Sequence, residues 1–150
     1  MKYEYRQLGA TDLLYMKQLN QVFSVAFEDP KSYESKLPSD EYLQTLLAKP
    51  TFIALVALSE GKVVGGLTAY VLEKFEQERS EIYIYDLAVA EEHRRKGIAT
   101  GLINELKVIA KEKGAYVIFV QADYGDDPAI KLYESLGTKE EVLHFDISMD

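Results

Sequence analysis

The chain has 150 residues, with 17 basic and 25 acidic side chains, a formal net charge of −8 and no cysteine. This length fits one domain over residues 1–150. The excess of acidic residues argues against nucleic-acid binding, which needs Lys and Arg opposite phosphates. The negative charge instead favours a cationic partner, or serves only solubility. The lack of cysteine excludes disulfides and thiol nucleophiles. No signal peptide is visible, and no apolar run approaches the roughly 20 residues of a membrane span. We therefore expect a cytoplasmic protein that does not enter membranes.

The N-terminal third predicts one short strand and two helices. Residues 2–8 alternate like a strand, and Thr11 can cap a helix whose apolar stripe covers residues 14–26. Ser39 can cap a second helix. Residues 29–38, between the two helices, are expected to form an irregular loop.

A meander of three strands is predicted next. The apolar runs at residues 51–58, 63–72 and 81–89 are separated by turns or charged loops. The pair Gly65–Gly66 inside the second run indicates a β-bulge or a close approach of the backbone to a neighbour.

The pattern then changes to an alternation of helix and strand. Residues 97–113 have a helical period, and residues 115–121 form an apolar strand, so we expect a right-handed parallel crossover. A further helix follows, which Asp126 or Asp127 can cap and which Gly137 ends.

Residues 141–148 alternate again, with Leu143, Phe145 and Ile147 on one face, and predict a final strand. Together these elements predict the α/β class. The expected architecture is a mixed, mostly antiparallel central sheet with helices on both faces.

The densest positive cluster lies at residues 93–100, where a strand turns into a helix. A helix N-terminus presents unpaired N–H groups and a positive dipole end, both of which favour phosphate. Gly97 and Ala99 let a phosphate approach the backbone, and the basic residues 94–96 can add charge-assisted contacts. The alternative is a solvated basic turn. Neither a Walker loop nor Gly-x-Gly-x-x-Gly is present, which disfavours NTP hydrolysis and dinucleotide binding.

The pattern Arg94-x-x-Gly97-x-Ala99 resembles the motif that holds the acetyl-CoA pyrophosphate in the Gcn5-related N-acetyltransferases, the GNAT superfamily. Residues 87–89 are similar to the family's strand that pairs with the pantetheine arm. The resemblance implies the GNAT fold, a splayed parallel strand pair that holds acetyl-CoA, and no metal. The cofactor-binding residues that it implies are Leu87, Ala88, Val89, Arg94, Arg95, Lys96, Gly97, Ile98, Ala99 and Thr100.

Within that superfamily, residues 81–89, 92–95 and 121–128 resemble the aminoglycoside 3-N-acetyltransferases, the gentamicin acetyltransferases. The resemblance implies acetylation of the 3-amino group of gentamicin-type drugs, and hence antibiotic resistance. It also suggests a homodimer, since relatives are often dimers. One departure concerns Asp126, which stands where the family commonly has Asn, and this puts a contact to the cofactor arm in doubt.

Acetyl transfer to an amine needs a base for the ammonium, a donor for the oxyanion and an acid for the thiolate. By the resemblance, the acid is Tyr133, which could otherwise be a core aromatic. The base candidates are Glu81, Asp86 and a water chain, and backbone N–H groups near Leu87 or Ala88 can serve the oxyanion. Strand alternation places Asp86 on the face opposite Glu81, unless a β-bulge turns it towards the cleft.

A cationic amine is expected to meet the acidic loop after the strand at residues 115–121, because ligands of open α/β sheets gather at the carboxyl ends of strands. Alternatively, these carboxylates only cap the following helix and carry exposed loop charges. The rival functions are acetylation of a polyamine or another small amine, and a catalytically silent acyl-CoA-binding domain. The substrate-binding residues expected are Tyr83, Tyr85, Asp29, Asp123, Asp126 and Asp127.

Overall fold

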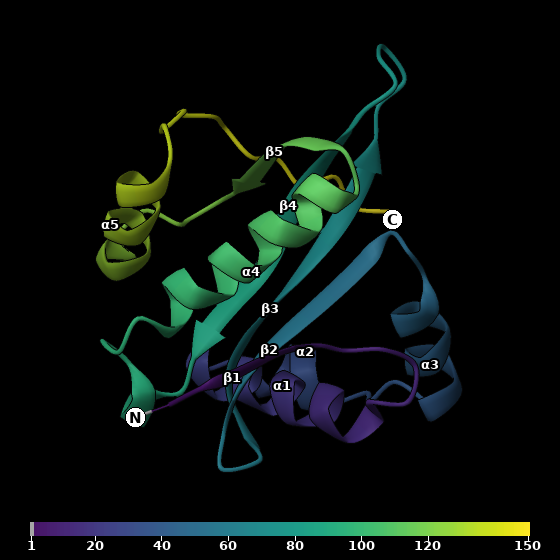
Figure 1. Cartoon of the computed structure of the whole chain (residues 1–150), viewed down its shortest axis with the longest axis vertical. Helices are drawn as coiled ribbons and strands as arrows, with labels where there is room; N and C mark the ends of the chain where they lie inside the picture. Colours follow the sequence, from purple (N-terminus) through teal and green to yellow (C-terminus); the bar gives the residue numbers. More distant parts are fainter. Residues whose placement is uncertain (1) are drawn as a thin grey trace.

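The computed structural model describes residues 2–150, so Met1 of the expected domain lies outside it. A five-stranded sheet in the order β1-β2-β3-β4-β5 forms its centre (Figure 1). The first four strands are antiparallel, and β5 pairs with β4 in parallel. The elements are β1 (Glu4–Gln7), α1 (Leu13–Ala26), α2 (Pro30–Glu34), α3 (Asp40–Ala48), β2 (Phe52–Ser59), β3 (Lys62–Glu73), β4 (Ser80–Val89), the 3-10 turn η1 (Glu91–His93), α4 (Ile98–Glu112), β5 (Ala115–Val120) and α5 (Asp127–Leu136).

Helices cover both faces of the sheet, which confirms the predicted fold class (Figure 1). On one face α4 packs Leu102 and Leu106 against the strands, and both side chains are fully buried. On the other face α1 and α3 bury Leu19, Phe23 and Leu43. Among residues 2–150 no helix combines the length and the apolar character needed to cross a membrane.

The glycine pair in β3 marks a close approach and lies beside a bulge, as predicted. A Cβ atom on Gly66 would lie 2.6 Å from the carbonyl oxygen of Leu55 and 2.5 Å from a methyl group of Leu19. The register between β2 and β3 shifts at Ala57 and Leu58. Only a residue without a side chain lets α1 lie this close to the sheet.

The parallel pair β4–β5 opens along its length. Its pairing runs from Ser80–Ala115 to Ile84–Val120, and residues 85–89 of β4 continue past the last pair. The β3–β4 register shifts between the Thr68–Asp86 and Ala69–Ile84 pairs, which leaves Tyr85 as the extra residue of a β-bulge. The strands are therefore splayed beyond Ile84.

Two local predictions in the N-terminal third need correction. The segment expected as a loop contains α2, because Asp29 accepts a hydrogen bond from the Ser32 N–H (3.2 Å) and Pro30 stands in the first turn. Asp12, rather than Thr11, precedes α1, and its carboxylate accepts from Arg6 (2.7 Å) instead of capping that helix. The Ser39 cap is confirmed.

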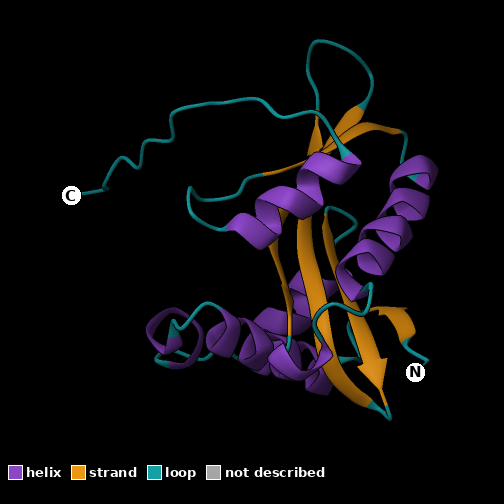
Figure 2. Cartoon of the chain, turned by 90° about the vertical axis from the view of Figure 1, so that its left-hand side faces the viewer, coloured by secondary structure: helices purple, strands orange, loops and turns teal. Residues whose placement is uncertain are grey.

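The predicted strand at 141–148 was wrong for the single chain. The tail, defined here as residues 138–150, carries no strand in the described structure and runs away from the sheet after α5 (Figure 2). Leu143, Phe145 and Ile147 are 81%, 77% and 84% exposed. A strand pattern forms a strand only where a neighbouring edge accepts its hydrogen bonds.

Candidate functional site

The basic turn enters α4 through strained backbone. Arg95 and Gly97 both have left-handed dihedrals, with φ of 64° and 80°. Such a turn aims successive N–H groups into one concavity, which is a common anion site. The Arg94 side chain folds back and donates from Nε to the Val89 carbonyl (3.0 Å). That bond joins the turn to the open end of β4.

The N-terminus of α4 is open to a ligand. Gly97, its N-cap, has no side chain, and the first intrahelical bond runs from the Gly101 N–H to the Gly97 carbonyl (2.9 Å). The N–H groups of residues 98–100 precede that bond and point out of the helix end, where the positive dipole end also lies. These features fit the pyrophosphate that the sequence motif implies.

The neighbouring edge of β4 fits an extended amide chain. Leu87 and Val89 pack on the α4 side, while Ala88 is buried in the cluster on the α1 side. Because this stretch lies past the last β4–β5 pair, its β5-facing edge can bond a ligand instead of a strand. The pantetheine arm of acetyl-CoA carries amides of this kind, so the residues present fit the cosubstrate.

The bulge turns Asp86 away from the α4 face. Its Oδ2 accepts a hydrogen bond from the Tyr33 hydroxyl (2.7 Å), and Tyr33 belongs to α2 on the other face. Simple alternation, which placed Asp86 opposite Tyr83 and Tyr85, therefore fails at this point. Burial raises the pKa of Asp86, while the bond from Tyr33 opposes that rise. Asp86 is thus a partly desolvated carboxyl beside the open half of β4.

Glu81 has a different environment at the start of β4. It accepts a hydrogen bond from the Tyr116 hydroxyl and lies 3.5 Å from Lys74 Nζ. The Tyr116 hydrogen bond lowers the pKa of Glu81, and the nearby Lys74 adds to this effect. Arg79 stacks over the Tyr116 ring, 3.7 Å from its centroid. Glu81 is part of an ion-pair cluster on the paired half of the strand.

Tyr133 extends from α5 onto the α4 side of the sheet. It packs against the core cluster that contains Leu102 and Leu106. Burial and the charge of Asp126 raise its pKa to about 12. Its hydroxyl therefore remains protonated at neutral pH and can donate a hydrogen bond.

An aromatic row crosses the opposite face. The rings of Phe119 and Tyr83 stack with centroids 4.8 Å apart, and Tyr83 and Tyr85 meet edge to face at 5.9 Å. The Tyr83 hydroxyl donates to Gln121 Oε1 (3.2 Å), at the start of the acidic loop. Tyr85 is 62% exposed, so one ring of the row remains available to a ligand.

Two of the predicted substrate carboxylates are helix caps. Asp126 accepts from the Ala129 N–H (3.4 Å) at the start of α5, and Asp29 serves α2 in the same way. Asp123 and Asp127 are exposed. Capping leaves one carboxylate oxygen free, so it does not prevent contact with a cation. Asp126 raises the pKa of Tyr133, and Asp29 raises that of Tyr33, so an acidic group lies near each of these two tyrosines.

The structure thus brings together the basic turn, the open β4 edge, Asp86 and the aromatic row, and it leaves Glu81 in a separate cluster. Tyr33 was missed, because the sequence carries no signal that joins α2 to a strand more than fifty residues later. Nowhere in residues 2–150 do three potential metal ligands of the His, Cys, Asp and Glu types come together.

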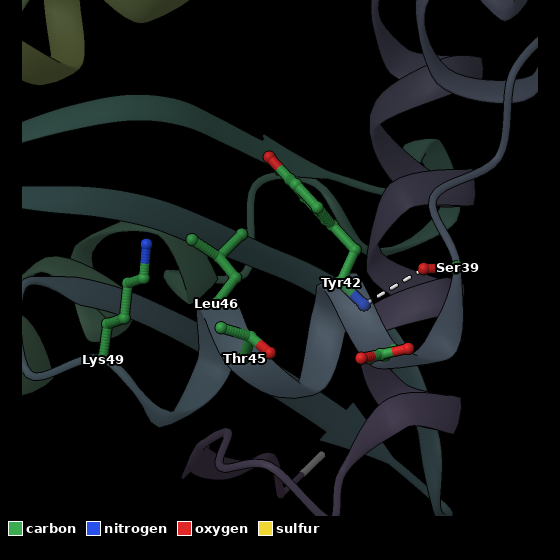
Figure 3. A pocket seen from close by; sticks show the side chains of 6 residues that line it. Ser39, Tyr42, Thr45, Leu46 and Lys49 are labelled. Carbon is green, nitrogen blue, oxygen red and sulfur yellow. Dashed lines mark hydrogen bonds between the residues drawn. The ribbon is translucent and has the colours of Figure 1, made fainter.

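A hollow of about 330 Å³ lies elsewhere, against α3 (Figure 3). Its lining residues are outside the predicted site, although Tyr42 lies close enough to Tyr70 to affect its pKa. The Ser39 hydroxyl accepts the Tyr42 N–H at its border (Figure 3). The residues that line it are Ser39, Glu41, Tyr42, Thr45, Leu46 and Lys49.

Comparison with known proteins agrees with this geometry. Residues 16–138 match the family model described as acetyltransferase (GNAT) family. Among solved structures, an aminoglycoside acetyltransferase from an uncultured soil metagenomic sample is 53% identical, with a TM-score of 0.98 and 100% of both chains covered. Another from such a sample, in complex with sisomicin, is 39% identical with a TM-score of 0.91, covering 99% of this chain and 97% of that one.

Curated relatives are more distant. N-acetyltransferase 8 of Homo sapiens is 27% identical over 131 residues, which are 79% of this chain and 58% of that protein. N-alpha-acetyltransferase of Saccharolobus solfataricus is 33% identical over 96 residues, which are 57% of this chain and 55% of that protein. The chain spans little more than half the length of these relatives.

Proposed function

Because the chain belongs to the GNAT acetyltransferase family, we propose that it is an enzyme that moves the acetyl group of acetyl-CoA to an amine of an aminoglycoside. The observation that carries this proposal is the full-length similarity, at 53% identity, to an aminoglycoside acetyltransferase. The finer proposal is that the acceptor is the 3-amino group of gentamicin-type drugs, so that the reaction confers resistance. The sisomicin complex of another neighbour supports a drug of this chemical class.

The cosubstrate is held, in this proposal, by the basic turn and the open half of β4. The N–H groups of residues 98–100 and the positive charges of Arg95 and Lys96, in the turn that precedes α4, are the proposed partners of the pyrophosphate. Arg94 is committed to the Val89 carbonyl and holds the turn in position. The edge at residues 87–89 bonds the extended arm, and an N–H of Leu87 or Ala88 receives the oxyanion.

Asp86 is the proposed base. Its carboxylate removes one proton from the substrate ammonium, and the neutral amine then attacks the acetyl carbonyl. A partly desolvated carboxyl with a raised pKa accepts a proton more readily than an ion-paired one, which favours Asp86 over Glu81. Tyr33 is a positioning residue, since its hydrogen bond fixes the carboxylate.

Tyr133 assists the departure of the thiolate. As the tetrahedral intermediate collapses, the C–S bond breaks and the new amide forms. The second nitrogen proton reaches the sulfur, and Asp86 releases the first to solvent, so that free CoA thiol, the acetylated amine and one proton are the products. A phenol with a pKa of about 12 remains protonated at pH 7 and donates a hydrogen bond to the negative sulfur.

The amine is received from the side of the aromatic row. Tyr85 offers a ring for stacking on a sugar, with Tyr83 edge to face beside it, and the carboxylates at 123, 126 and 127 offer partners for several ammonium groups. Asp29 adds a negative charge next to Tyr33. A polycationic sugar fits this combination of rings and carboxylates.

Release of free thiol from acetyl-CoA tests the function with gentamicin, with spermidine and without an acceptor. We expect turnover with gentamicin that exceeds turnover with spermidine, and NMR of the product should find the acetyl group on the 3-amino nitrogen. Turnover with spermidine alone would overturn the drug proposal in favour of a polyamine enzyme. Tight acetyl-CoA binding without turnover on any amine would indicate a silent binding domain.

A further inference from the structure

The aromatic row on the sheet continues past Tyr85. Tyr70 of β3 meets Tyr85 edge to face with ring centroids 5.9 Å apart, and Phe52 of β2 lies 5.3 Å further on. Ala69 and Val71, the neighbours of Tyr70 in the strand, pack in the core on the α4 side, so the ring of Tyr70 lies on the opposite face. Tyr70 is 39% exposed and Phe52 is buried. The exposed part of the row therefore extends from β4 to β3.

The hollow against α3, called the α3 hollow from here on, borders this extension. Residues 42, 45, 46 and 49 recur at helical spacing, and this face of α3 lines the hollow (Figure 3). Tyr42 is 62% exposed. Burial raises the pKa of Tyr70, and the nearby Tyr42 and Asp86 raise it further. Tyr70 is thus a common neighbour of the α3 hollow and of the proposed base.

The α3 hollow carries one charge of each sign. Glu41 lies in the first turn of α3 and Lys49 is its C-cap, so about 12 Å of helix separates them. Asp40 is paired with Lys17 (2.7 Å), but neither Glu41 nor Lys49 forms an ion pair within residues 2–150. A ring wall with a free carboxylate beside it fits a sugar that carries an ammonium group.

We propose, on the basis of the function proposed above, that the α3 hollow holds the outer sugar of a three-ring aminoglycoside, stacked on Tyr42 and Tyr70 with its ammonium at Glu41. In gentamicin-type drugs one amino sugar is attached next to the 3-amino group, and the other is attached across the central ring from it. When the 3-amino group lies at Asp86, Tyr70 intervenes before the α3 hollow, so the more remote sugar is the one that reaches it. α3 then distinguishes three-ring drugs from two-ring ones.

The two charges of the α3 hollow test this placement with opposite signs. The KM from thiol release and the Kd from calorimetry are measured for sisomicin, which has the remote sugar, and for neamine, which lacks it. Glu41→Gln should raise both constants for sisomicin by about tenfold, the low end for a charge-assisted contact, and those for neamine by less than about twofold. Lys49→Gln removes a repelling charge and should lower the sisomicin constants about twofold.

Glu112→Gln is the matched control, because it removes an exposed carboxylate at the far end of α4, on the other face of the sheet. It should change neither drug's constants. General damage to the fold would weaken both drugs and could not produce the opposite signs expected for Glu41 and Lys49.

The ring of Tyr42 gives an independent test. Tyr42→Ala should raise the KM for sisomicin about fivefold with kcat nearly unchanged, and Tyr42→Phe, which keeps the ring, should behave as the parent. Equal effects on sisomicin and neamine, or no effect on sisomicin, would overturn the placement of the sugar while the parent still acetylates the drug. A parent that neither binds nor acetylates sisomicin would overturn the proposed function, and the placement with it.

Discussion

The two halves of β4 each carry one carboxylate, and the two carboxylates lie in different environments. Residues 80–84 pair with strands on both sides, and their carboxylate, Glu81, is held by Tyr116 and Lys74 with a lowered pKa. Residues 85–89 lie beyond the end of β5, and their carboxylate, Asp86, is half-buried beside Tyr33 with a raised pKa. A single extra residue in the strand separates a structural acid from a proposed base.

The largest expected effect comes from removing the two carboxylates in turn. Asp86→Asn should lower kcat by about 10³-fold, because no base remains for the ammonium, while Glu81→Gln should change kcat by less than about threefold. The thiol-release assay measures both. A greater loss in the Glu81 variant would reverse the assignment of the base.

Removal of the Asp86 carboxylate should also affect the stability of the fold. Burial makes the folded protein bind the Asp86 proton more tightly than the unfolded chain does, so the carboxylate form weakens folding above the raised pKa. Asp86→Asn should therefore melt at a higher temperature than the parent at pH 7. The difference should shrink as the pH falls through that raised pKa.

Tyr133→Phe tests whether the tyrosine on α5 assists the departure of the thiolate. We expect a decrease in kcat of about 10²-fold, the low end for acid assistance, with little change in the KM for acetyl-CoA. Burial of the ring is kept by Phe, so the melting temperature should stay close to that of the parent. An unchanged kcat would remove Tyr133 from the chemistry.

Removing charge from the basic turn and from the acidic loop should affect two different KM values, the first for acetyl-CoA and the second for the drug. Arg95→Ala should raise the KM for acetyl-CoA by about 10- to 100-fold, as expected for the loss of a charge-assisted contact of about 1.5–3 kcal/mol. Replacement of Asp123, Asp126 and Asp127 by Asn should raise the KM for the drug by a similar factor. Asn still caps α5, so the triple variant isolates the charge.

Lys107→Ala, an exposed cation on α4 away from the turn, is the control for Arg95→Ala and should change neither KM. If the Arg95 variant affected only the drug, or the triple variant only acetyl-CoA, the proposed division of the site would be wrong.

Tyr33→Phe should have the smallest effect and the most specific one. The Tyr33 hydrogen bond lowers the pKa of Asp86, so its loss should move the acidic limb of the pH–rate profile to higher pH. We expect kcat at neutral pH to fall only a few-fold. A fall that is uniform over all pH values would indicate a purely structural role for Tyr33.

Much of the fold followed from local pattern. The meander, the crossover helix and the helix that Gly137 ends were predicted with nearly correct bounds, because apolar period and turn residues act over a few positions. The errors had different causes. Asp12 precedes α1 and forms an ion pair with Arg6, so Thr11 does not cap that helix. Asp29 and Pro30 are local signals for α2 that were not used, and an alternating pattern in the tail makes no strand within residues 2–150.

The order of the elements, the basic turn before α4 and the family were predictable from the sequence, because each depends on residues close together in the chain. The packing of distant segments determines which carboxylate on β4 is desolvated, that Tyr33 holds it, and that β5 pairs only with β4 within residues 2–150. A bulge reverses which face a residue occupies, and an edge is free or paired according to the whole sheet. Both depend on register between strands, which no single segment encodes.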